Sequence, residues 1–244
     1  MEFKINQNEF NLRFENYGIV SNQILNNYNN PQQIELRIFD VRFRIALGLR
    51  ISLDSNYAHV KTENTRNTYK LILGLNEFWF AYEGFSKYYK IIRNIANYKS
   101  LPNLITNEDS EENAITLLVV QFRELLNNNI HTNEYLKNDF IRYLDYLIAN
   151  SKQDQGNRLS RFKVNFCNEG EISLNEILSL IYAIRCMYVH QGHTAKTGVN
   201  FYKTKILVLK ICKDFLILFL LIFSNKVMSD FLETQNNRLE KKIF

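Results

Sequence analysis

The stretch IYAIRCMYVHQG, residues 181–192, has Arg185 and His190 near the end of an apolar helical segment. A histidine titrates near neutral pH, so His190 is a candidate general base or acid. An arginine stays charged and offers a planar fork of donors that suits a phosphate group. The pair therefore predicts proton transfer next to a bound phosphate. The alternative is a surface arginine followed by a histidine that ends its helix, where the helix dipole favours a cation.

The segment around this pair contains basic residues but no acidic ones. No Asp or Glu occurs from Ile177 to Lys213, although the chain has 25 acidic residues in 244. Such a basic segment attracts phosphates and polyanions. The candidate substrate-binding residues are Cys186, His193, Lys196, Lys203 and, from an earlier helix, Glu83. Alternatively, the lysines form an ordinary solvated face that pairs with the acidic segment NEDSEEN at 107–113.

Other classes of site lack a motif in this sequence. The three cysteines, Cys167, Cys186 and Cys212, form no CxxC pair, and the four histidines lack metal-ligand spacing. We therefore expect no disulfide framework, no metal and no cofactor. The first ten residues, MEFKINQNEF, have no apolar signal-peptide core. The most apolar segment, 215–223, is too short to span a bilayer. These features predict a cytoplasmic protein without a membrane role.

Helices must position the candidate residues. Only eight glycines and two prolines interrupt a chain that is 46% hydrophobic, which predicts an all-α, up-and-down helical bundle. Helices are expected over 65–97, 109–127, 136–147, 173–191 and 202–223. The first has an apolar stripe from Ile72 to Tyr89 and a polar face that includes Asn76 and Glu83. Ser173 and Glu176 form a predicted capping box at the start of the helix that contains Arg185.

Polar segments at 26–31, 100–113 and 150–158 are predicted loops. We expect an N-terminal extension (1–64) packed on a helical-bundle core (65–224), and a C-terminal tail (225–244). One region, 41–53, fits two patterns. It alternates apolar and polar residues as a strand does, but a row of aliphatic residues also fits one helical face. That row is Ile34, Ile38, Val41, Ile45 and Leu49. We favour a helix.

The stretch IRCMYVHQG, followed by a long helix, resembles the Arg-x(4–6)-His motif of the HEPN superfamily of small helical bundles. The resemblance covers residues 174–213 and implies a four-helix core with additional N-terminal helices. Members are commonly endoribonucleases that need no metal. Cys186 stands where many members have Asn. Gly192 stands where members paired with nucleotidyltransferase antitoxins have Tyr.

The resemblance also implies a homodimer. Five residues along a regular helix put Arg185 and His190 about 140° apart, which is poor for joint action on one phosphate. Two copies facing each other across a twofold axis remove this difficulty, as does unwinding of the last turn before Gly192. Aromatic residues make up 14% of the chain and suit an apolar interface between copies. We expect both side chains to be exposed in a cleft and dispensable for packing.

Two functions agree with these features. The first is a metal-independent endoribonuclease with Arg185 and His190 as catalytic residues. The resemblance places such an enzyme in toxin–antitoxin or antiviral defence, with RNA as substrate and an antitoxin or regulatory protein as a possible partner. The second is a non-catalytic helical module that binds RNA, a nucleotide or a partner protein through the same basic groove.

The basic segment leads to a first prediction. RNA binding weakens steeply as salt is raised, because contacts between lysines and phosphates release counterions and log affinity falls linearly with log salt concentration. Fluorescence anisotropy of a labelled RNA, measured from low to moderate salt, tests this. An affinity that stays flat over that range contradicts a role for this segment.

Overall fold

The computed structural model describes residues 3, 7–27, 31–52, 63–95, 112–189 and 202–243. Over these residues the chain forms eight α-helices, one π-helical turn and no strand, which confirms the predicted all-α bundle. The elements are α1 (Gln7–Asn27), α2 (Pro31–Gly48), α3 (Glu63–Ile92), α4 (Glu112–Leu126), η2 (Asn127–His131), α5 (Glu134–Ala149), α6 (Gln153–Cys167), α7 (Leu174–Val189) and α8 (Tyr202–Ile243).

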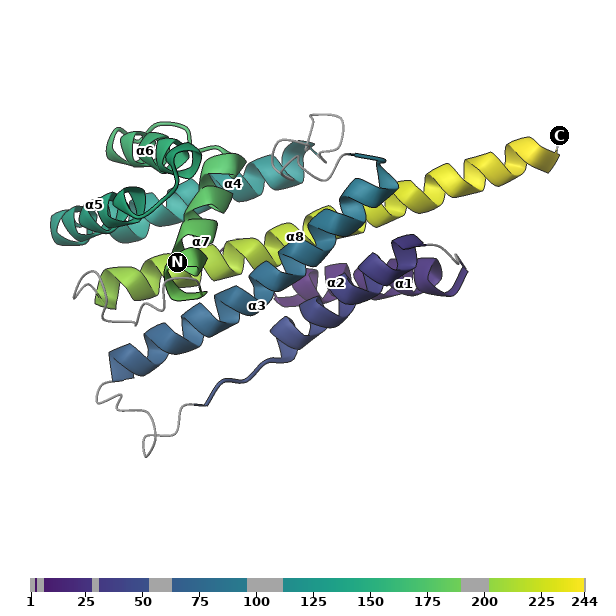
Figure 1. Cartoon of the computed structure of the whole chain (residues 1–244), viewed down its shortest axis with the longest axis horizontal. Coiled ribbons are helices and arrows are strands. Elements are labelled where there is room, and N and C mark those ends of the chain that lie inside the picture. Colours follow the sequence, from purple (N-terminus) through teal and green to yellow (C-terminus); the bar gives the residue numbers. More distant parts are fainter. Residues whose placement is uncertain are drawn as a thin grey trace.

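Two long helices, α3 and α8, run side by side along the molecule (Figure 1). Helices α1 and α2 lie on one side of this pair, where α2 packs on α3 and α1 on α8. Helices α4, α5 and α6 lie on the other side, and α7 is steeply inclined to α3 and α8 in Figure 1. The two central helices therefore have neighbours on both sides, and most of the core lies around them.

The core between α3 and α8 is aromatic. Phe223 of α8 contacts Phe85 and Tyr89 of α3, each with ring centroids 5.5 Å apart. Phe219 lies 6.4 Å from Tyr82 in the same way. The predicted apolar stripe of α3 is confirmed, because its members are buried: Ile72, Leu75, Trp79, Tyr82 and Tyr89. Asn76 differs from the prediction, since it is buried as well.

Helix α2 settles the pattern at 41–53 in favour of helix through Gly48. Its buried face consists of Leu36, Phe39, Phe43 and Ala46, which pack toward α1 and α3. The aliphatic row that fits one helical face in the sequence lies on the other side, where each member is at least 37% exposed.

One glycine allows α2 and α3 to approach closely. A Cβ atom added to Gly84 of α3 would lie 3.3 Å from the Cα of Phe39 and 3.4 Å from its backbone nitrogen. Such contacts are with backbone, which cannot rotate away as a side chain does. The packing of α2 on α3 therefore depends on the missing side chain at Gly84.

Two predicted boundaries are wrong. Residues 150–158 were expected to be a loop, but α6 begins at Gln153. Its buried residues, Leu159, Phe162 and Phe166, follow helical spacing. The polar residues before them form the first turn of the same helix and not a loop. The last helix was expected to end at Phe223, but α8 continues to Ile243.

The added length of α8 is packed against the bundle. Val227, Met228 and Leu232 are buried, and the side chain of Asn225 donates a hydrogen bond of 2.9 Å to the backbone carbonyl of Arg13 in α1. Residues 225–232 thus belong to the core and not to a tail. Within the described ranges, no helix is both long enough and apolar enough to cross a membrane.

The close approach at Gly84 leads to a prediction. Gly84→Ala should lower the free energy of unfolding, although alanine is the better helix former, because the new methyl group meets the α2 backbone. Gly74→Ala is the matched control, since a Cβ there meets only the flexible Lys213 side chain, at 3.6 Å.

Gly74→Ala should raise stability by up to about 1 kcal/mol through helix propensity. Gly84→Ala should be less stable than Gly74→Ala by about 1–3 kcal/mol. Urea denaturation measures both differences. Two variants of equal stability would contradict the close packing of α2 on α3.

Candidate functional site

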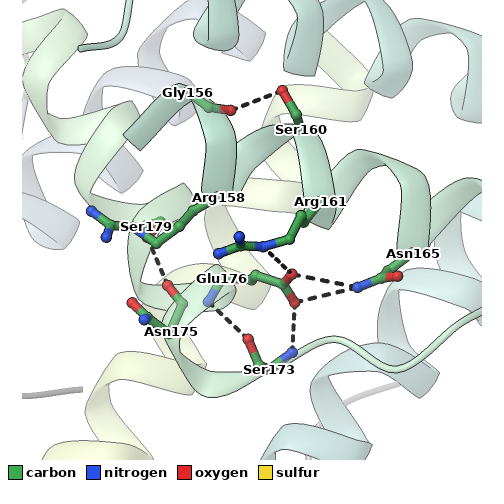
Figure 2. A network of polar contacts seen from close by, with 9 residues as sticks. All are labelled: Gly156, Arg158, Ser160, Arg161, Asn165, Ser173, Asn175, Glu176 and Ser179. Carbon is green, nitrogen blue, oxygen red and sulfur yellow. Dashed lines mark hydrogen bonds and ion pairs between the residues drawn. The ribbon is translucent and has the colours of Figure 1, made fainter. Parts of the chain in front are cut away.

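Helix α7, which contains Arg185, is held firmly at its first turn. The predicted capping box is confirmed: the Ser173 backbone N–H donates to Glu176 at 2.8 Å, and the Glu176 backbone N–H donates to Ser173 Oγ at 3.3 Å. Figure 2 shows that Asn165 and Arg161 of α6 also approach the Glu176 carboxylate. This carboxylate is buried and holds α6 and α7 together.

A second contact joins the same two helices one turn further along α7. Arg158 Nε of α6 donates to Ser179 Oγ at 2.9 Å (Figure 2). Arg161 Nε, on the same helix, lies 3.8 Å from the Glu176 carboxylate. In the structure both guanidinium groups lie against α7, so they position the helix that contains Arg185.

The prediction that Arg185 is exposed in a cleft is wrong. Only 7% of its side chain is accessible. One guanidinium nitrogen lies 3.6 Å from a carboxylate oxygen of Glu83 on α3. The guanidinium carbon lies 5.4 Å from the centre of the Phe80 ring, within the range of a cation–π contact. A charge this deeply placed needs such compensation. Arg185 thus contributes to the packing of α7 on α3.

Glu83, a predicted substrate-binding residue, connects this buried charge to solvent. Its carboxylate accepts a hydrogen bond of 2.8 Å from the indole N–H of Trp79, one turn earlier on α3. The same oxygen faces Arg185, while 45% of the Glu83 side chain is exposed. The structure therefore brings together two of the predicted residues, Glu83 and Arg185, from helices about one hundred positions apart in the sequence.

A second arginine, which no motif or spacing in the sequence indicates, lies against the same aromatic ring. The guanidinium carbon of Arg42, on α2, is 5.5 Å from the Phe80 centroid, so it lies at most about 11 Å from that of Arg185. Arg42 is half exposed and 3.9 Å from Glu77. Nothing local in the sequence relates Arg42 to Arg185, because their proximity depends on the packing of α2 on α3.

The outer face of α7 beside Arg185 is aromatic and polar. The Tyr182 ring is 38% exposed and lies 5.3 Å from the Trp79 ring. A hydrogen bond between Tyr182 and Cys186, together with burial, raises the pKa of the tyrosine hydroxyl. Cys186, a candidate substrate-binding residue, is half-buried and contacts Tyr182 in this way.

The other predicted site residues are either outside the described part of the chain or distant in sequence from Arg185. His190, His193 and Lys196 lie outside the described residues. Lys203 is exposed in the first turn of α8. Its neighbour Lys205 is buried, with its ammonium 5.4 Å from the centre of the Tyr143 ring. The acid-free segment is therefore not one continuous basic surface.

Three features define the candidate site: a buried guanidinium, a half-exposed carboxylate and an aromatic surface, at the end of α7 that leads directly to His190. Among the described residues, no group of three or more histidine, cysteine or acidic side chains is placed to hold a metal ion. No protein-family model, curated protein or solved structure matches the chain. A function for this site is therefore inferred from the chemistry of its residues.

The buried lysine leads to a prediction about pH. Burial lowers the pKa of Lys205 from its ordinary 10.5 to about 8. Between these two values the unfolded chain binds the proton and the folded protein does not, so the stability contributed by this residue rises with pH. Lys205→Met should remove that rise and increase stability at pH 7 by up to about 3 kcal/mol.

Urea denaturation at pH 7, 8 and 9 measures this effect below the range in which unfolded tyrosines ionise. Lys203→Met, two positions away and exposed, is the control and should keep the wild-type pH dependence. An unchanged slope in Lys205→Met would show that Lys205 does not bury a charge below pH 8.

Proposed function

We propose that this chain is a metal-independent endoribonuclease of the HEPN type, with Arg185 and His190 as its catalytic residues. The observation that supports this most is the placement of Arg185, whose guanidinium is held by Glu83 and Phe80 on α7, five positions before His190 in the sequence. Catalytic charge stabilisation requires a group that is already oriented before the substrate arrives. A freely moving surface arginine would lack this property.

The reaction uses a group that RNA itself supplies. His190 removes the proton from a 2′-hydroxyl, and the 2′-oxygen attacks the adjacent phosphorus. The bond from phosphorus to the 5′-oxygen breaks, and that oxygen takes a proton from a protonated histidine. The products end in a 2′,3′-cyclic phosphate and a 5′-hydroxyl. Arg185 stabilises the negative charge that grows on the phosphoryl oxygens.

Glu83 has a definite part in this proposal. Its carboxylate neutralises Arg185 in the free protein, at a distance longer than a charge-assisted hydrogen bond of about 2.7–2.9 Å. A phosphate can replace the carboxylate, because Glu83 is half exposed and is able to swing into solvent. This exchange also breaks the hydrogen bond that the Trp79 indole donates to the same carboxylate oxygen. A second copy of the chain would supply further residues around the bound phosphate.

The test is cleavage of a mixed RNA pool in excess EDTA. His190→Ala and Arg185→Ala should each reduce the rate about a hundred- to a thousandfold, the usual cost of losing one charge-stabilising donor. Arg142→Ala, which replaces an exposed arginine on α5, is the control. It should retain activity.

Two further readouts separate catalysis from folding. Arg185 is buried, so thermal melting of Arg185→Ala must show that the variant is folded at the assay temperature. Arg185→Lys retains the charge and serves as the conservative variant. Cleavage that survives loss of both Arg185 and His190, or that requires added divalent metal, contradicts the nuclease proposal at this site.

The burial of Arg185 also favours a second candidate, a non-catalytic module that binds RNA, a nucleotide or a partner protein. A guanidinium that is 7% accessible and paired to α3 holds two helices together whether or not a substrate is present. In this case, RNA binds with a steep salt dependence but stays intact, and His190→Ala leaves the affinity unchanged.

A further inference from the structure

The aromatic surface beside Arg185 has no part in the proton and phosphate chemistry of the candidate site. Tyr182 of α7 is 38% exposed, and its ring lies 5.3 Å from the Trp79 ring on α3, at an angle of 33°. Trp79 itself is buried. An exposed aromatic ring that rests on a buried one is an apolar surface on which another planar group can stack.

The Tyr182 ring is held in place by two contacts. Its hydroxyl forms a hydrogen bond with Cys186, one turn later on α7, and its ring contacts Trp79. A tyrosine has only two side-chain torsions, and these contacts restrict them before any ligand arrives. A ligand that stacks on this ring therefore loses little affinity to the ordering of the protein side chain.

Tyr182 lies close to the group proposed to hold a phosphate. Residues three positions apart, such as Tyr182 and Arg185, are neighbours on a helix surface, with Cβ atoms about 5–6 Å apart. Tyr182 contacts Trp79 of α3. Arg185 contacts Phe80 and Glu83 of the same helix. A stacking surface and a guanidinium are thus placed one helical turn apart on α7 and against the same segment of α3.

A nucleotide presents the two groups that this arrangement can bind. It has a planar base and a charged phosphate, which are joined by one ribose. Stacking of a base on an aromatic side chain tolerates any sequence, because every base has a π-face. Within a duplex the faces of a base are covered by its neighbours, so stacking on a protein ring requires an unpaired base.

We propose that Tyr182 stacks on an unpaired base of the nucleotide whose phosphate is held by Arg185, and that the ligand of this surface is single-stranded RNA. This inference rests on the proposed function, because it takes Arg185 as the phosphate-binding group. Stacking involves neither His190 nor bond cleavage, so binding can be measured without the reaction.

The test uses a short labelled 2′-O-methyl oligonucleotide, which lacks the hydroxyl needed for cleavage. Fluorescence anisotropy measures its affinity for the full chain. Tyr182→Leu retains an apolar side chain but loses the ring, and it should weaken binding about five- to a hundredfold, the range expected for the loss of one base-stacking contact. Tyr182→Phe retains the ring and should bind nearly as well as the wild-type chain.

Tyr135→Leu is the matched control, since it replaces a tyrosine on α5 that is 69% exposed. It should leave the affinity unchanged. A second control changes the ligand and not the protein. An abasic strand of the same length retains the phosphates, so the wild-type chain and Tyr182→Leu should bind it equally. The wild-type chain should also bind the single strand more tightly than the same sequence in a duplex.

The proposal is overturned if Tyr182→Leu and Tyr135→Leu bind the base-containing strand equally, or if the wild-type chain prefers the duplex. It is also overturned if Tyr182→Leu weakens binding of the abasic strand as much, which would show a purely structural role. The nuclease proposal fails separately. Binding that depends on Tyr182 while unmodified RNA stays intact supports stacking and contradicts cleavage, whereas cleavage that Tyr182→Leu leaves unchanged does the reverse.

Discussion

A guanidinium cannot be placed inside a helical bundle without a negative or aromatic partner, and this constraint organises the region around Arg185. Its charge is compensated by Glu83 and by the Phe80 ring, both on α3. Trp79 in turn orients Glu83 through its indole N–H. The register of α7 on α3 is therefore specified by polar contacts as well as by apolar packing, which allows a single arrangement of the two helices.

Helix α3 serves as the common element of core and site. Its Gly84 allows the α2 backbone to approach, its Phe85 and Tyr89 pack on α8, and its Glu83 faces Arg185. These residues are consecutive or nearly so, and they point in different directions around one helix. A change that shifts α3 relative to α2 or α8 would therefore also move the carboxylate that compensates Arg185.

The Phe80 ring contacts two arginines that come from different helices. Arg42 and Arg185 both lie against it, at nearly equal distances. Arg42 also lies 3.9 Å from Glu77 of α3. The packing of α2 on α3 thus brings a second guanidinium close to Arg185.

The sequence by itself determined the features that depend on local chemistry. Helical periodicity gives the α-helical class and the buried stripe of α3, and the Ser173–Glu176 capping box forms because its partners are three residues apart. The start of α6 could not be predicted, because its first turn is polar and resembles a loop in composition. Only the later residues of this helix are apolar. Which face of α2 is buried, the burial of Arg185, and its contact with Glu83 were decided by tertiary structure alone. Each depends on residues far apart in the chain, and one-dimensional spacing does not encode which helix packs on which.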